Sequence, residues 1–228
     1  MPTPAYCRPA AYQMFAEQLA NVEDAAGLFR AAFAIAMHER PEASLAEAET
    51  IVENLALTVR SRVHSSSHEA LLAHLHDVLF DVFGLCGNEA DYYDPANSYL
   101  PDVLRTRRGI PISLVLVYCR VAEPLGLVVH GVNAPGHFLA EVELSGSVGI
   151  EQMYVDPFFG GGVLNEHEAA ERISQATGKP TVLTPEMLAR ATPRKWLARM
   201  LNNLQASFAA AGHERDVCAM QELHELLS

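Results

Sequence analysis

The chain has 228 residues, a length typical of one domain or of one core with a small appendage. Sixteen Lys and Arg against 28 Asp and Glu give a net charge of −12, which disfavours binding to nucleic acid or anionic membrane. Half of the residues are hydrophobic, which excludes global disorder, and no apolar run reaches the roughly 18 residues of a membrane span. We therefore expect a folded protein with neither nucleic acid nor membrane as a partner.

The chain start lacks a basic segment followed by an apolar run, so we expect no signal peptide. The four cysteines, at positions 7, 86, 119 and 218, show no paired spacing. This pattern predicts reduced thiols and a cytoplasmic location.

The first hundred residues predict helices. Asp24 to His38 is Ala-rich, and Ser44-Leu-Ala-Glu47 and Ser66-Ser-His-Glu69 are capping boxes that open two further helices. Apolar residues then recur every three or four positions, which predicts one buried stripe on each helix. Gly84 ends the second of these helices.

A different pattern begins at Pro111. A helix is predicted from Pro111 to about Pro124, followed by three strands at 128–133, 137–143 and 149–156. The strands are bounded by Gly, Pro, Asn or Ser, and their connections are short enough for antiparallel neighbours. We therefore predict an α+β fold in which a small antiparallel sheet packs on a central helix.

The rest of the chain returns to helices. The run 158–162 predicts a flexible loop, and Asn165-Glu-His-Glu168 is a capping box for a helix that Gly178 ends. Apolar stripes after Pro193 and Gly212 predict a C-terminal hairpin that resembles one tetratricopeptide unit and must pack on the rest of the protein. The sequence thus divides into a helical N-terminal region, a core and a helical hairpin, at 1–95, 96–183 and 184–228.

Three side chains carry the candidate chemistry. Ser113 lies in the first turn of the central helix, His137 opens a predicted strand, and Asp156 ends the next strand. If the two strands form a hairpin, His137 and Asp156 are neighbours, as a base and its orienting carboxylate must be. A nucleophile at the helix N-terminus would complete a triad, because free amides and the helix dipole favour negative charge there.

Three segments resemble the transglutaminase-like domain of the bacterial SirB family: NSYLPDVLRTRRGIPISLVLVY, GLVVHGVNAPGHFL and YVDPFFGG. The match covers roughly residues 76–163, and KWLARMLNNL resembles that family's first C-terminal helix. The resemblance implies a papain-like core flanked by an N-terminal helical region and tetratricopeptide-like C-terminal helices. It also implies a Cys–His–Asp triad, in which His137 and Asp156 match the His and the Asp.

The Cys is where this sequence departs from the family. In active superfamily members the Cys lies about fifteen residues before the Gly of an L-G-I-P-like turn. That Gly corresponds to Gly126 here, and counting back from it leads to Pro111. Proline has no nucleophilic atom, and Cys119 is nearly two turns inside the helix. The absent thiol argues against transglutaminase or cysteine-protease activity.

Three hypotheses follow for the function. We favour a thiol-lacking module that binds a protein or peptide partner in its cleft, with Asn97, Arg108 and Pro111 as candidate binding residues. The first alternative is a hydrolase or acyltransferase that uses Ser113 with His137 and Asp156, and the second is a metal enzyme built on His137.

The pattern predicts no cofactor and no metal site, since His64 and His68 lack a third ligand nearby. The oligomeric state and the role of the basic cluster at 105–108 stay open.

Overall fold

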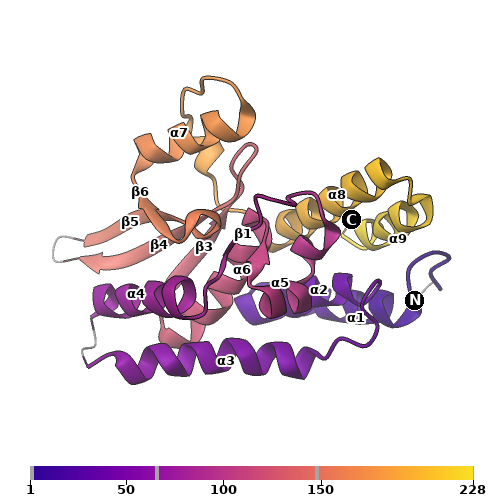
Figure 1. Ribbon diagram of the computed structural model, residues 1–228, viewed down its shortest axis with the longest axis horizontal. Helices are drawn as coiled ribbons and strands as arrows, with labels where there is room; N and C mark the ends of the chain where they lie inside the picture. The colour runs from indigo at the N-terminus through magenta and orange to yellow at the C-terminus, as the bar shows by residue number, and fades with distance from the viewer. Residues whose placement is uncertain (1–2, 65–66, 147–148, 228) are drawn as a thin grey trace.

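The computed structural model describes residues 3–64, 67–146 and 149–227, and it has the predicted α+β fold. Helices form the N-terminal region. They are α1 (Pro9–Gln18), α2 (Ala25–Ala36), α3 (Leu45–Arg62) and α4 (His68–His76), with a 3₁₀ turn, η1 (Leu19–Asn21), after α1. In Figure 1, α3 lies along the lower edge, α4 at the left and α1 and α2 at the lower right. The last turn of α4 widens into a π-helix, η2 (Asp77–Val82), which ends at Gly84 with a φ of +79°.

The predicted helix starts are found close to their expected positions. Ser44 accepts a hydrogen bond from the Glu47 N–H (3.3 Å), but the return bond of a full capping box is not made among the described residues. The second of these helices starts one residue later than predicted, because its N-cap is Ser67 and the predicted N-cap was Ser66. Ser67 accepts a hydrogen bond from the Ala70 N–H (3.1 Å). Ser66 lies outside the described residues. Three consecutive serines offer the same hydroxyl, so sequence could not select between them.

The central helix is α6 (Pro111–Ala122), and all of its residues are buried. It contacts α2 and α3 on one side and the sheet on the other, which explains an apolar character around the whole helix. Before it come η3 (Pro95–Ser98), α5 (Leu100–Thr106) and an unpredicted parallel pair of short strands, β1 (Cys86–Gly87) and β2 (Arg108–Gly109). After it, η4 (Glu123–Leu125) ends at Gly126, with a φ of +80°.

The sheet is antiparallel, in the order β3-β4-β5-β6. Its strands are β3 (Val128–Val132), β4 (Leu139–Gly146), β5 (Gly149–Asp156) and β6 (Gly162–Leu164). The first three lie close to the predicted ranges, whereas β6 was not predicted and begins at the last residue of the loop expected at 158–162. A 3₁₀ turn, η5 (Pro157–Phe159), is followed by Gly160 and Gly161 with positive φ, which reverse the chain so that β6 pairs with β5.

Both faces of the sheet are covered. One face packs on α6 in the main hydrophobic core, while Leu139, Tyr154 and Leu164 on the other face belong to a second apolar cluster. That cluster is completed by α7 (Glu166–Thr177) and η6 (Pro185–Leu188). The capping box at Asn165 is confirmed, with both of its hydrogen bonds formed.

The predicted C-terminal hairpin consists of α8 (Pro193–Ala211) and α9 (Glu214–Glu225). Its apolar stripes join the main core, so this core contains residues from all three predicted parts of the chain. The boundaries at 95 and 183 stay a prediction. In the part of the chain that the structure describes, no helix combines the length and hydropathy needed to cross a membrane.

Candidate functional site

His137 and Asp156 meet at one end of the β4–β5 hairpin. His137 lies in a turn closed by its N–H and the carbonyl oxygen of Ala134 (3.2 Å), so β4 begins two residues later than predicted. The register pairs Ala140 with Val155, so Leu139, the first residue of β4, comes opposite Asp156, the last residue of β5, and His137 lies two residues before Leu139. His137 Nε2 lies 3.0 Å from Asp156 Oδ2, so the predicted neighbourhood is confirmed.

Asp156 is fully buried and has three polar partners. Oδ2 faces His137 Nε2 and Arg172 Nε, the latter at 3.1 Å, and Oδ1 accepts from the Phe158 N–H at 3.1 Å. A carboxylate excluded from water needs such partners, because an unpaired buried charge is strongly destabilising. The carboxylate therefore holds the His137 ring with a hydrogen on Nε2, which leaves Nδ1 as the acceptor.

Aromatic rings enclose the imidazole. Phe158 stands edge-on to it and Phe159 lies tilted beside it, each with its centroid 6.2 Å away. Arg172 stacks over the Phe159 ring at 4.0 Å while it pairs with Asp156. Among the described residues, no hydrogen bond engages His137 Nδ1, so this nitrogen is available to a ligand.

A cavity of about 470 Å³ opens beside the imidazole. Its walls include Tyr92, Pro111, His137, Phe158, Phe159 and Arg172. Two apolar side chains reach solvent at the rim, with Tyr93 80% exposed and Phe159 42% exposed. A concave, aromatic wall with a few polar groups is typical of a ligand site.

The position predicted for a nucleophile is occupied by Pro111, which shares the cavity wall with His137. Ser113 is fully buried, and its hydroxyl contacts the carbonyl oxygens of Asn97 (2.6 Å) and Ile110 (3.0 Å). The Ser113 hydroxyl fits closely, because a Cβ on Gly109 would lie 2.8 Å from Ser113 Oγ. Within the described chain, no hydrogen bond joins Ser113 to His137.

Cys119 is also unsuited to attack a substrate. It is buried inside α6, and burial raises the pKa of its thiol to about 12. A thiol with that pKa is almost entirely protonated near neutral pH, and the protonated form is a poor nucleophile.

The predicted binding residues have different surroundings. Only Pro111 lines the cavity. The buried Asn97 amide donates to the carbonyl oxygens of Asp91 (2.6 Å) and Tyr92 (3.2 Å), so it holds the loop that carries the tyrosines. Arg108 is exposed and donates to Cys86 Sγ, away from the cavity walls.

The basic cluster at 105–108 is dispersed in the structure. Arg105 pairs with Asp102 (2.8 Å), and Arg107, with a φ of +62°, stacks over Phe83 at 5.4 Å. The three arginines therefore point to different partners, although they are close in sequence.

Sequence reasoning missed Arg172 and the two phenylalanines. Phe158 and Phe159 are separated from Asp156 only by Pro157, so their closeness in sequence was a usable signal. Arg172 lies on α7, sixteen residues after Asp156, and no spacing rule links it to the site.

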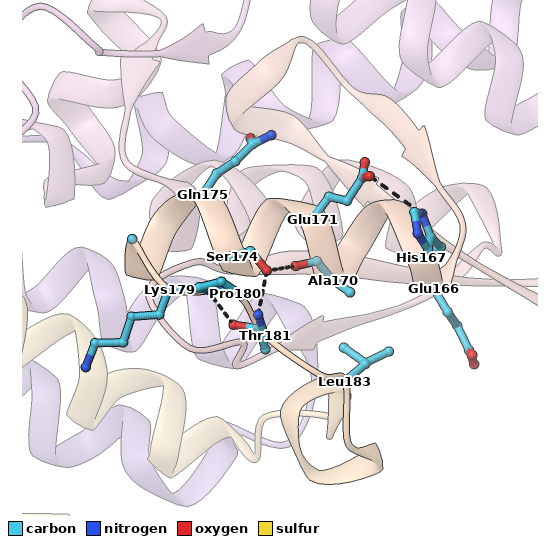
Figure 2. Close-up of a pocket in the computed structure, with 11 residues that line it drawn as sticks. Glu166, His167, Ala170, Glu171, Ser174, Gln175, Lys179, Pro180, Thr181 and Leu183 are labelled. Atoms are coloured by element: carbon cyan, nitrogen blue, oxygen red, sulfur yellow. Dashed lines mark hydrogen bonds and ion pairs between the residues drawn. The ribbon is translucent and has the colours of Figure 1, made fainter.

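A larger and more open hollow, of about 980 Å³, lies on the outer side of α7 (Figure 2). Its polar contacts are local: His167 faces Glu171 (3.8 Å), and Ser174 Oγ bonds with Ala170 and Thr181. It lacks the buried His–Asp pair, so its size alone does not make it the better candidate.

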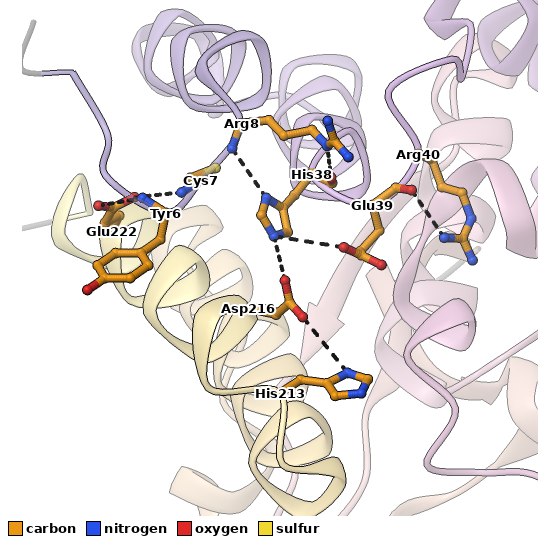
Figure 3. A network of polar contacts seen from close by, with 9 residues as sticks. All are labelled: Tyr6, Cys7, Arg8, His38, Glu39, Arg40, His213, Asp216 and Glu222. Carbon is orange, nitrogen blue, oxygen red and sulfur yellow. Dashed lines mark hydrogen bonds and ion pairs between the residues drawn. The ribbon is translucent and has the colours of Figure 1, made fainter.

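One cluster among the described residues has the composition of a metal site. His38, Glu39 and Asp216 offer ligand atoms within 4.8 Å of one another (Figure 3). However, His38 Nδ1 accepts from the Arg8 N–H (3.3 Å), so Nε2 carries the hydrogen and donates to Asp216 (3.0 Å). A ring nitrogen that carries hydrogen cannot bind a metal, and this cluster instead ties the end of α2 to α9.

Comparisons with known proteins agree with this architecture. A family model described as the transglutaminase-like superfamily matches residues 46–202. A UPF0162 protein of Xylella fastidiosa (strain 9a5c) is 35% identical over 196 residues, which cover 84% of this chain and 68% of that protein. A UPF0162 protein of Pseudomonas aeruginosa is 29% identical over 190 residues, or 81% of this chain and 66% of that protein.

Similarity also extends to a eukaryotic protein. F-box only protein 21 of Homo sapiens is 34% identical over 139 residues, which are 59% of this chain and 21% of that protein. No solved structure matches the chain. From the family model and the Xylella relative, the chain belongs to the transglutaminase-like superfamily.

Proposed function

We propose that this protein binds an extended peptide segment of a protein partner in the cavity beside His137 and does not cleave it. The observation that carries the proposal is Pro111, which occupies the cavity wall where a catalytic thiol is expected. Ser113 Oγ is engaged with two backbone carbonyls, which favours a structural role for this hydroxyl. Without a nucleophile, the buried His–Asp pair serves as a rigid polar anchor.

The cavity suits a peptide chemically. Tyr92, Phe158 and Phe159 offer an apolar wall for a side chain, and His137 Nδ1 offers an acceptor for a peptide N–H or hydroxyl. The exposed rings of Tyr93 and Phe159 extend the apolar surface beyond the cavity mouth. A segment with one apolar side chain in the cavity would bury these rings.

Finer assignments belong to the same proposal. We propose that the chain is of the SirB branch, on the segments quoted above, and that the α8–α9 hairpin acts like a tetratricopeptide unit. The four unpaired cysteines support a cytoplasmic location.

A blocking substitution tests the peptide site. Ala176 lines the cavity on α7, so Ala176→Trp should fill it, whereas Ala170→Trp on the same helix faces the outer hollow. A random peptide library displayed on phage is selected on the unmodified protein. Selected peptides should bind Ala170→Trp normally and Ala176→Trp at least tenfold more weakly. An empty selection, or equal binding to both variants, would contradict the proposal.

The alternative function is a hydrolase or acyltransferase that uses Ser113 with His137 and Asp156. The intact His137–Asp156 contact is the observation in its favour. A fluorophosphonate probe that labels the unmodified chain but not Ser113→Ala would support this alternative. If neither protein is labelled, the alternative is wrong.

A further inference from the structure

A second pocket lies beside the loop that carries His137. It measures about 440 Å³ and lies between the loop before His137 and one face of α8. The residues that matter here are Asn133, Ala134, Gly136, Lys195, Arg199 and Asn202. Lys195, Arg199 and Asn202 follow helical spacing, so they form a polar stripe opposite the apolar stripe of α8.

The two cations of this pocket lack an acidic partner in the part of the chain that the structure describes. Within the described ranges, neither Lys195 nor Arg199 forms an ion pair with a carboxylate, although the chain has a net charge of −12. Arg190 differs, since it is held by Glu141 (Nε to Oε1, 2.9 Å) and Glu143. The pocket is therefore locally positive on an acidic protein, which attracts an anion.

Arg199 is held in place with part of its guanidinium free. Nη1 donates to Asn133 Oδ1 and to the carbonyl oxygen of Ala134 (2.8 Å), and the guanidinium lies over Phe138 at 5.5 Å. Nε and Nη2 make no hydrogen bond with the rest of the described chain. Burial lowers the pKa of Arg199, since its charge is partly removed from water without a counter-ion. A carboxylate bound to Nε and Nη2 would compensate the lost solvation of the guanidinium and form two parallel hydrogen bonds with it.

The pocket shares one lining residue with the cavity beside His137. Gly136 lines both, and it is the residue directly before the imidazole. The charge of Arg199 also acts on Tyr92, where it opposes the rise in the phenol pKa that burial causes. Since Tyr92 forms part of the cavity wall, the charge of Arg199 acts on both sites.

We propose that this pocket is an anionic subsite, in which Arg199 and Lys195 bind the side-chain carboxylate of an acidic residue in a peptide that also occupies the His137 cavity. The inference rests on the proposed peptide-binding function and adds to it a preference for Asp or Glu. The fork of Arg199 fits a planar carboxylate, and Lys195 adds a second positive charge. The partner is therefore an acidic segment, even though the whole chain is itself acidic.

The test uses the full ¹⁵N-labelled chain and two capped pentapeptides, Ala-Glu-Ala-Glu-Ala and Ala-Gln-Ala-Gln-Ala. The Nε–Hε resonance of Arg199 is identified by its loss in Arg199→Lys. We expect a saturable shift of this resonance with the Glu peptide, and at least tenfold weaker binding of the Gln peptide. Lys195→Gln should weaken binding of the Glu peptide at least threefold, and this exposed side chain can be replaced without loss of core packing.

The matched control is the double variant Lys179→Gln/Arg215→Gln, which removes two exposed charges outside the pocket and should bind like the unmodified chain. An unmoved Arg199 resonance, or equal effects of the control and Lys195→Gln, would refute the subsite. Inorganic phosphate that binds as tightly as the Glu peptide would refute the assignment to a peptide carboxylate.

If selected peptides bind the cavity but Arg199 does not respond, the subsite fails while the proposed function stands. If Arg199 responds equally in Ala176→Trp, the subsite does not depend on the cavity and the link between them fails.

Discussion

At the scale of single residues, the buried ionisable groups differ in how well they are satisfied. Asp156 has three polar partners for its two oxygens, and its charge is balanced by Arg172. His76 is partly buried, and among the described residues its one side-chain hydrogen-bond partner is the Tyr118 hydroxyl at 2.9 Å, with no carboxylate paired to it. The Asp156 carboxylate therefore stabilises the fold when it is charged, whereas the His76 imidazole does so only when it is neutral.

Asp156→Asn should lower the free energy of unfolding by about 2–4 kcal/mol, measured by urea denaturation. The amide removes the negative charge opposite Arg172 and turns a donor toward groups that already donate. Asp94→Asn is the control in the other Asp-Pro dipeptide, where the exposed side chain caps η3 and Asn caps about equally well. Similar losses in both variants would show that Asp156 has no special role in stability.

His76 predicts a dependence of stability on pH. Burial lowers its pKa to about 4 from the ordinary 6.5, so the folded protein resists protonation that the unfolded chain accepts. Its contribution is present above the unfolded pKa and is lost as the pH falls toward about 4. Between about pH 7.5 and about pH 5, the unmodified chain should lose about 1–2 kcal/mol more stability than His76→Gln. Parallel pH profiles for the two proteins would contradict this account.

At the scale of elements, the first turn of α6 decides which chemistry the site can perform. Pro111 is well suited to the first helical position, because its missing N–H would have no helical partner there. The same turn borders the cavity that His137 lines, at a helix end where anions are favoured. The first turn of α6 thus has the surroundings that a catalytic nucleophile needs, but Pro111 has no reactive atom.

Pro111→Cys should create a reactive thiol at this position. The helix end and the imidazole of His137 should lower the thiol pKa, so alkylation by iodoacetamide near neutral pH should be at least tenfold faster than for any native cysteine. Cys119 should stay unreactive because burial raises the pKa of its thiol to about 12. The added His137→Ala substitution should remove most of the rate increase. A rate that His137→Ala leaves unchanged would mean that the two positions do not interact.

At the scale of the whole molecule, the chain ends are bound to each other. The Glu222 carboxylate on α9 accepts from the N–H groups of Ala5 (2.7 Å) and Cys7 (2.8 Å), close to the His38–Asp216 contact (Figure 3). The apolar face of α8 lies in the same core as α2 and α6. From these contacts we expect the C-terminal hairpin to unfold together with the rest of the core.

Removal of residues 184–228 should therefore abolish cooperative unfolding. Leu197, Met200 and Leu201 are fully buried, and their loss would expose the facing sides of α2 and α6. Urea denaturation followed by circular dichroism should give one transition for the full chain and no cooperative transition for residues 1–183. A cooperative transition at the same urea concentration in both would instead support a separate domain at 184–228.

Local sequence signals determined most of the elements and half of the site. Helix caps, glycine stops and apolar spacing act within a few residues, so they predicted α6, the hairpin β4–β5 and the start of α7. The meeting of His137 and Asp156 followed from one strand pairing, which short connections nearly dictate. The strand β6 was missed because two glycines with positive φ form its turn, and glycines are equally typical of a flexible loop.

Tertiary structure alone decided which groups surround His137 and Asp156. Arg172 reaches Asp156 from α7, and Arg199 reaches the loop before His137 from α8, across separations that no local periodicity spans. The direction of the Ser113 hydroxyl likewise depended on the carbonyl oxygen of Asn97, sixteen residues away. Sequence determines where the backbone turns through short-range sterics and hydrogen bonding, whereas partners of a buried charge are chosen by the packing of distant elements.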